Sequence, residues 1–210
     1  SLQAGIAERG LAPEPEGGGG PIAEQGAYAY HLDARALAAY LAELAVSEGV
    51  VHHRDHVRHV VRDASGAIER IETASGQALA ADLFVDCTGL KALLLGEHYG
   101  VPFVSRGDVL FNDSALALQV PYADRDGPIA SQTISTAQSA GWIWDIGLPT
   151  RRGTGHVYSS AHISEDEATA QLLAYIRDIA GDEAAASVVP RKIQYQPGYR
   201  REFWHRNCVA

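Results

Sequence analysis

Two tryptophans one residue apart, Trp142 and Trp144, are the side chains best suited to build an apolar wall in this chain. If the stretch around them is a strand, Trp142, Trp144 and Ile146 share one face, because side chains alternate along a strand. Ile143 and Asp145 then lie on the other face. Two indoles on one face make a broad, flat surface. On spacing alone, the simplest interpretation of that surface is ordinary core, since tryptophan is usually well buried.

A turn of small residues after an apolar segment is the second candidate. Residues 82–87 are nearly continuously apolar, which predicts a strand buried on both faces. Thr88 and Gly89 follow, and residues 90–95 have a helical pattern. A buried strand, a small-residue turn and a helix start together present backbone N–H groups to an anion. A plain strand–helix turn accounts for the same residues equally well.

Histidines are frequent between residues 52 and 59, but they do not predict a metal site. No set of carboxylate or cysteine ligands accompanies them, so exposed strand histidines are the better interpretation. The two cysteines, Cys87 and Cys208, are too few and too far apart to indicate a zinc site or a disulfide framework. This cysteine usage favours a reducing cytoplasm.

The composition bounds the class of protein. A chain of 210 residues with 46% hydrophobic residues is long enough to bury a sizeable core. A net charge of −9 argues against a nucleic-acid partner, which requires a basic face. No apolar run approaches the roughly 18 residues of a membrane span, and no signal-peptide pattern is present. The sequence therefore predicts a globular protein without nucleic-acid or membrane partners.

The order of elements predicts two sheets. Residues 1–26 are rich in glycine and proline and are expected to form a loop or linker. Asp33 is a good N-cap for a helix that ends before Gly49. The other predicted elements are a meander of strands 50–62, 68–73 and 77–79, a second all-β region over 110–160, a helix over 164–180 that begins with a capping box and stops at Gly181, and a strand over 188–195.

The stretch Gly141–Ile146 resembles the Trp-x-Trp-x-Ile signature of the flavin-dependent halogenases, the tryptophan halogenase family. Family members usually carry proline directly after the isoleucine, whereas here Gly147 and Leu148 precede Pro149. Four further segments resemble the family in the same order: Tyr30-His31-Leu32-Asp33-Ala34, Asp82 to Gly89, Gly155 to Ser160, and Asn207 to Ala210. Several ordered matches are more specific than any one of them.

The resemblance implies an α/β (α+β) fold, a glutathione-reductase-like FAD-binding domain fragment with an antiparallel substrate-domain sheet. It implies that residues 27–105 form part of the FAD-binding domain and that residues 106–163 form the substrate-domain sheet. Residues 164–210 would then be a helix and strands that return to the FAD-binding domain.

Site residues follow from the same resemblance. Val57 matches the family position whose backbone faces FAD, although an inward strand valine is an equally good interpretation. Cys87, Thr88 and Gly89 would lie close to the nucleotide half of the cofactor.

The substrate side of the site is also implied by the resemblance. Trp142, Trp144 and Ile146 would wall the channel between flavin and substrate. His31 would offer its imidazole as a shelf for the arene, the alternative being a histidine that forms hydrogen bonds at the start of the helix.

The implied activity is halogenation of an indole or another electron-rich aromatic with reduced FAD (FADH2), oxygen and halide. The implied partners are a flavin reductase, the small aromatic substrate and halide, and a homodimer is left open. The family's dinucleotide fingerprint, catalytic lysine and catalytic glutamate match nothing in this sequence. We therefore assign no catalytic residue, and we expect this to be the central part of a larger flavoprotein that does not halogenate by itself.

The sequence leaves two alternative functions open. A flavin-dependent aromatic hydroxylase shares the implied fold, but a hydroxylase must bring its substrate up to the flavin, which a Trp-x-Trp-x-Ile wall opposes. A truncated, non-catalytic remnant of the halogenase fold would bind neither FAD nor substrate productively.

Overall fold

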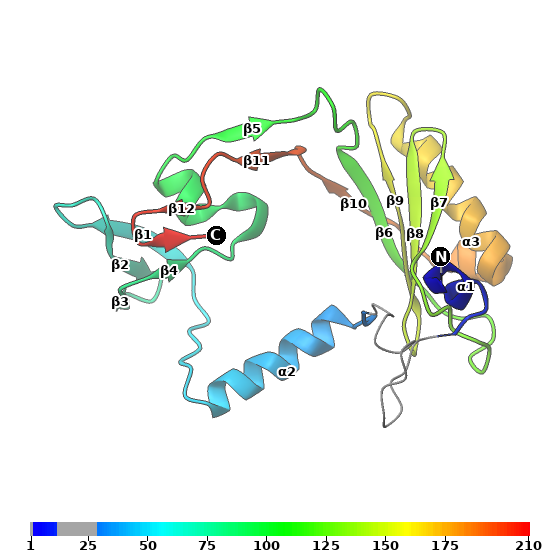
Figure 1. Cartoon of the computed structure of the whole chain (residues 1–210), viewed down its shortest axis with the longest axis horizontal. Helices are drawn as coiled ribbons and strands as arrows, with labels where there is room; N and C mark the ends of the chain where they lie inside the picture. The colour runs from blue at the N-terminus through cyan, green and yellow to red at the C-terminus, as the bar shows by residue number, and fades with distance from the viewer. Residues whose placement is uncertain (1, 12–28) are drawn as a thin grey trace. The chain divides into compact units, whose positions relative to one another are not determined.

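A computed structural model describes residues 2–11 and 29–210, which divide into two compact units (Figure 1). One unit combines the described residues up to 39 with residues 111–194, and the other combines residues 40–110 with residues 195–210. Residues 164–194 thus belong to the same unit as residues 111–163.

A five-stranded antiparallel sheet is the centre of the first unit. Its strands lie in the order β10-β6-β9-β8-β7. Their bounds are β6 (Ser114–Val120), β7 (Ile134–Gln138), β8 (Gly141–Gly147), β9 (Arg152–Tyr158) and β10 (Arg191–Gln194). Every pairing is antiparallel, as the family resemblance implies for the sheet in residues 106–163.

One long helix, α3 (Glu165–Ser187), packs on β6 and β9. The predicted capping box at its start is confirmed: the Ser164 side chain accepts a hydrogen bond from the Glu167 amide, and the Glu167 carboxylate accepts one from the Ser164 amide. Gly181 takes the non-helical angles φ 88° and ψ 170°, so the helical run from Glu165 stops there as predicted, and a second helical segment follows within α3.

The hydrophobic core of this unit lies between α3 and the sheet. Leu172 and Ile176 of α3 are fully buried against Leu116 and Ile143 of the strands. One face of the sheet is therefore covered by α3.

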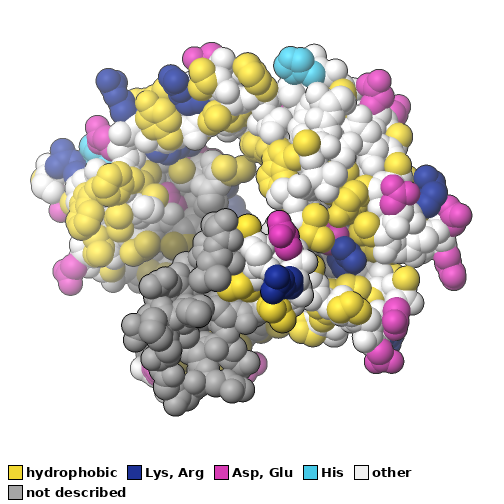
Figure 2. All heavy atoms as spheres, turned by 45° about the vertical axis from the view of Figure 1, so that its right-hand side comes forward, with side chains coloured by type: hydrophobic (Ala, Val, Ile, Leu, Met, Phe, Trp, Pro, Cys, Tyr) yellow, Lys and Arg dark blue, Asp and Glu magenta, His cyan; other side chains and the backbone are white. Residues whose placement is uncertain are grey.

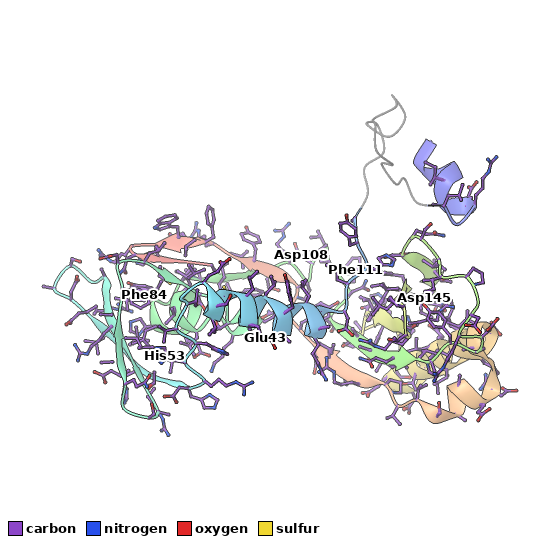
Figure 3. The ribbon with its side chains drawn as sticks, turned by 90° about the horizontal axis from the view of Figure 1, so that it is seen from below. Glu43, His53, Phe84, Asp108, Phe111 and Asp145 are labelled. Atoms are coloured by element: carbon purple, nitrogen blue, oxygen red, sulfur yellow. The ribbon has the colours of Figure 1, made fainter. Side chains whose placement is uncertain are left out.

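The second unit holds three smaller sheets and two short helical turns. The predicted meander is present as β1 (Val57–Arg62), β2 (Ile68–Thr73) and β3 (Ala78–Ala80), in antiparallel order β1-β2-β3. The second sheet has β12 (Trp204–His205), β13 (Cys208–Val209) and β4 (Phe84–Val85), and the third pairs β11 (Gly198–Arg200) with β5 (Phe103–Ser105). A 3-10 turn, η2 (Gly89–Lys91), and a π-helix, η3 (Leu93–His98), follow β4. A separate core, which includes Phe84, Leu95 and Cys208, holds this unit together (Figure 3).

Three further expectations from the sequence need correction. Residues 2–8 form a short helix, α1 (Leu2–Glu8), where a loop was predicted, and the rest of the predicted loop lies almost entirely outside the described residues. The first meander strand begins at Val57 rather than at residue 50. The strand at residues 82–87 is only two residues long and is not buried on both faces: Phe84 is buried, whereas Val85 is 60% exposed.

The helix α2 (Ala34–Ser47) begins where Asp33 predicts. The Asp33 carboxylate accepts hydrogen bonds from the amides of Arg35 and Ala36 at 3.1 and 3.3 Å.

Charged and hydrophobic side chains are mixed on the surface. On the face shown in Figure 2, acidic and basic side chains of the described residues are interspersed with hydrophobic ones. Within residues 2–11 and 29–210, no helix is long and apolar enough to cross a membrane.

Candidate functional site

The register of the sheet places the two tryptophans on the face opposite α3. Each residue of β8 on that face has a cross-strand partner on β9, which in turn has one on β6. The three rows are Trp142–Val157–Ala115, Trp144–Gly155–Ala117 and Ile146–Gly153–Gln119. The predicted sharing of one face by Trp142, Trp144 and Ile146 thus follows from the observed pairing.

Within residues 2–11 and 29–210, the indole face is partly exposed, in contrast to the strand face that packs on α3. Trp142 is 39% exposed and Trp144 is only partly buried. Ile143 and Asp145, on the side of α3, are 0% and 2% exposed. The indoles of Trp142 and Trp144 contact each other edge to face, with ring centroids 6.3 Å apart. Helix α3 packs on the other face of the sheet through its apolar side, which includes Leu172 and Ile176.

The Trp144 indole packs against Gly155 of β9, which has no side chain to obstruct it. A Cβ at this position would lie 2.2 Å from two carbons of the Trp144 indole and 2.3 Å from the backbone oxygen of Leu116. The indole therefore packs directly onto backbone. Gly153, two residues earlier on the same face, has no atom within 4 Å of such a Cβ.

On the strand face opposite the indoles, Asp145 (labelled in Figure 3) forms a buried ion pair with Arg152, which the sequence did not predict. The Arg152 guanidinium donates to both carboxylate oxygens, with Nε at 2.9 Å from Oδ1 and 3.1 Å from Oδ2. The Tyr175 hydroxyl of α3 donates to Oδ2 at 3.0 Å. The hydrogen bond to Asp145 raises the pKa of Arg152. Burial, and then the neighbouring Asp145, raises the pKa of Tyr175. A lone carboxylate between two apolar strand residues was the available signal.

His31 lies at the end of β8, which no local pattern predicts. Its Nδ1 is 3.1 Å from the backbone oxygen of Gly147, and its Nε2 is 3.2 Å from the hydroxyl of Thr133. The structure therefore brings His31 to the strand that carries the indoles. Both ring nitrogens have partners, so any contact with an arene would use the face of the ring.

In the second unit, Asp86 organises the turn that contains Cys87, Thr88 and Gly89. Its carboxylate accepts hydrogen bonds from the Thr88 hydroxyl at 2.6 Å and from the amides of Leu94 and Leu95 at 2.8 and 3.0 Å. Burial alone would raise the pKa of Asp86, but these hydrogen bonds outweigh burial and leave the pKa below its ordinary value. Asp86 therefore caps the start of the π-helix and fixes the turn.

The residues predicted to contact FAD are divided between the β1–β3 sheet and the turn that follows β4. Cys87 is exposed, and Gly89 takes φ +65° with no atom within 4 Å of an added Cβ, so open space adjoins the turn. Val57 is 37% exposed and lies in the β1–β3 sheet, whereas Cys87 follows β4 of another sheet. Cys208, which pairs with Phe84, is fully buried, and burial raises the pKa of its thiol to about 11.

His156 makes the stability of the first unit depend on pH. It is fully buried, its Nδ1 donates to the backbone oxygen of Ala168, and its Nε2 has no partner among the described residues. Burial lowers its pKa, so the unfolded chain binds a proton at a higher pH than the folded one. We expect the free energy of unfolding to fall as pH drops below about 6.5, by at most about 1.4 kcal/mol per pH unit from this residue.

Urea denaturation from pH 8 to pH 5 measures this slope. His156→Gln should flatten it. A slope that His156→Gln leaves unchanged would contradict the assignment.

The sequence and the fold of this chain are both similar to those of known proteins. The family model described as tryptophan halogenase matches residues 2–210. The chain belongs to the tryptophan halogenase family. It is 46% identical over 183 residues to the 7-chloro-L-tryptophan 6-halogenase KtzR of Kutzneria sp. (strain 744). The aligned residues make up 87% of this chain and 34% of that protein. This tryptophan halogenase family member thus spans about a third of the length of that curated relative.

Solved structures agree with the family assignment. The tryptophan halogenase of Shewanella frigidimarina is 43% identical with a TM-score of 0.85, covering 99% of this chain and 39% of that one. BrvH, a flavin-dependent halogenase from Brevundimonas sp. BAL3, is 36% identical with a TM-score of 0.86, covering 100% of this chain and 41% of that one. The halogenase fold and the α/β (α+β) class predicted from the sequence are confirmed.

Proposed function

We propose that this chain is part of an FAD-dependent halogenase that uses reduced FAD, oxygen and halide to halogenate an indole or another electron-rich aromatic. The observation that carries the proposal is the partly exposed indole face of β8 in a tryptophan halogenase family member. Trp142 and Trp144 stand on the side of the sheet that α3 leaves uncovered. The alternative of an aromatic hydroxylase is not favoured, because the family match covers residues 2–210.

The turn after β4 fits a nucleotide cofactor. The hydroxyl and the amide of Thr88 donate to the Asp86 carboxylate, which fixes the turn between Cys87 and Gly89, and the space next to Gly89 is open. The exposed N-terminal end of β1 would add the Val57 backbone. FAD, when bound, would supply the oxidative chemistry that no side chain can supply.

The chain's own contribution is to exclude water and to direct the substrate. Trp142, Trp144 and Ile146 would wall an apolar passage, which shields a reactive oxidant from solvent. His31, fixed through both ring nitrogens, would present its ring face at the end of that wall. The remaining partners would be a flavin reductase, halide and the arene.

Product mass tests the proposal. The complete protein that contains residues 1–210, incubated with a flavin reductase, FAD, bromide and an indole, should give a brominated product. Trp144→Ala in that protein should lower the yield by roughly tenfold or more, since mispositioning in an active site commonly costs 10²-fold. Trp204→Ala, an exposed tryptophan of the other unit, is the matched control.

Two outcomes would contradict the proposal. Added oxygen without added halogen would indicate a hydroxylase. A bromination rate that Trp144→Ala and Trp204→Ala leave equally unchanged would remove the indole face from the mechanism.

A further inference from the structure

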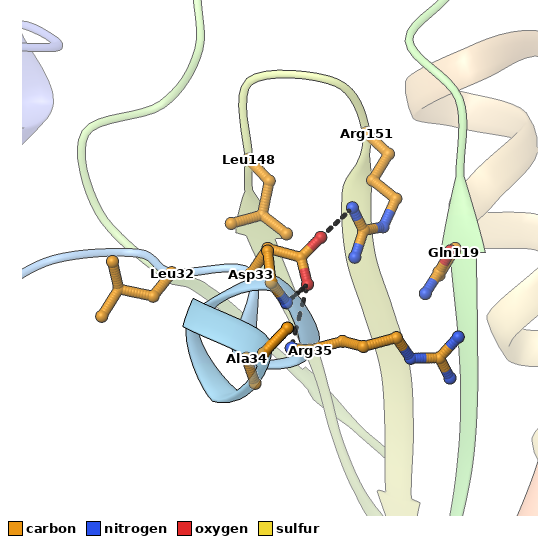
Figure 4. A pocket seen from close by; sticks show the side chains of 9 residues that line it. Leu32, Asp33, Ala34, Arg35, Gln119, Leu148 and Arg151 are labelled. Atoms are coloured by element: carbon orange, nitrogen blue, oxygen red, sulfur yellow. Dashed lines mark hydrogen bonds and ion pairs between the residues drawn. The ribbon is translucent and has the colours of Figure 1, made fainter. Parts of the chain in front are cut away.

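A pocket of about 690 Å³ lies where α2 begins, against β6 and the turn between β8 and β9 (Figure 4). All of its lining residues belong to the first unit. Its volume is within the range of small-molecule sites, about 300–1,000 Å³. None of the residues assigned to the halogenase site above lines it.

The charges around the pocket leave an excess cation. Arg151 donates to Asp33 at 2.8 Å, and the hydrogen bond from Arg151 lowers the pKa of Asp33, so both groups are charged. Arg35 also lines the pocket, and among residues 2–11 and 29–210 its guanidinium has no carboxylate partner. Two cations thus face one carboxylate.

The polar groups available to a ligand are side chains. The amides at the start of α2 already donate to Asp33 and are not free for an anion. Arg35 extends from α2 toward β6, which carries Gln119 (Figure 4). A guanidinium and a carboxamide together offer several donors to one carboxylate.

The rest of the pocket is apolar. Leu148 is 7% exposed and forms one part of the wall. The wall is completed by Leu32 and by three alanines of α2, which are Ala34, Ala36 and Ala39. Gln119 lies in the same cross-strand row as Ile146, so the pocket adjoins the end of the indole face. A ligand here needs an apolar body as well as a charge.

We propose that this pocket binds a small organic monoanion, a carboxylate with a short aromatic or aliphatic body, held between Arg35, Arg151 and Gln119. One excess positive charge favours a monoanion over a dianion, and the leucine and alanine walls favour an organic body over an inorganic ion. The proposal does not rest on halogenase activity, because binding requires neither flavin nor turnover.

Titration of the ¹⁵N-labelled chain with benzoate tests the proposal, with benzamide as a neutral molecule of the same shape. Benzoate should shift the amide resonances of residues 32–39, Gln119 and Leu148 in a saturable way. Benzamide and inorganic phosphate should bind at least roughly tenfold more weakly. Arg35→Gln should weaken benzoate binding by roughly tenfold, the effect of losing one charge-assisted hydrogen bond.

Arg177→Gln is the matched control, since Arg177 lies on α3 and pairs with Asp182. The proposal would be overturned by an absence of saturable shifts at tens of millimolar benzoate, by equal binding of benzoate and benzamide, by tighter binding of phosphate, or by equal effects of Arg35→Gln and Arg177→Gln. Because no readout involves product, failure here leaves the halogenase proposal separately testable.

Discussion

Replacing Asp145 with alanine is expected to lower the free energy of unfolding of the first unit by about 3–5 kcal/mol, the usual cost of breaking a buried ion pair. The Asp145 side chain is 1% exposed, and that of Arg152 is 20% exposed. Without the carboxylate, Arg152 retains a largely desolvated charge, and the Tyr175 hydroxyl loses its acceptor. Urea denaturation followed by circular dichroism measures the change.

A double replacement separates the charge from the packing. Asp145→Leu together with Arg152→Met removes both charges and should cost less than Asp145→Ala alone, because no unpaired charge remains. Tyr175→Phe, which removes one hydrogen bond, should cost about 1 kcal/mol. If Asp145→Ala costs no more than Tyr175→Phe, the ion pair does not hold the hairpin.

The second large effect is expected at Gly155. An added methyl group would lie 2.3 Å from the backbone oxygen of Leu116, so strand β6 or the Trp144 indole must move. Overpacking of this kind costs about 1–3 kcal/mol, and contact with backbone places Gly155→Ala at the upper end. The Trp144 indole should move as well, which changes the tryptophan fluorescence.

Gly153→Ala is a close control for this experiment. It adds the same methyl group to the same strand and the same face, where no atom lies within 4 Å. It should change the free energy of unfolding by no more than about 0.5 kcal/mol. Equal effects of the two substitutions would show that glycine is needed for a reason other than the indole above it.

Local signals in the sequence were sufficient for most elements. The capping box at Ser164 and the N-cap at Asp33 specify helix starts through contacts within four residues, and both are observed. The meander over β1–β3 follows from short strands and tight turns. The stop at Gly181 is also observed, because its φ of 88° lies outside the helical region, whereas the helical segment that follows it was not predicted.

The candidate site was harder to predict for a physical reason. Alternation along β8 defines two faces but not which of them a helix will cover, since that depends on α3, which begins only after another strand, β9. Asp145 and Arg152 pair only because the β8–β9 register brings the strands together. The roles of Val57, Cys87, Thr88 and Gly89 toward FAD stay predictions.

The pairing of β4 with β13 has a consequence for the order of folding. Ile68 exchanges hydrogen bonds with Asn207, 139 residues away, and Phe84 pairs with Cys208. The whole five-stranded sheet, residues 114–194, lies inside that closed loop. During synthesis the sheet and α3 can therefore assemble before the second unit has its closing strand, β13. The apolar residues of the second unit, Phe84 and Leu95 among them, remain exposed to chaperones until Cys208 has been synthesised.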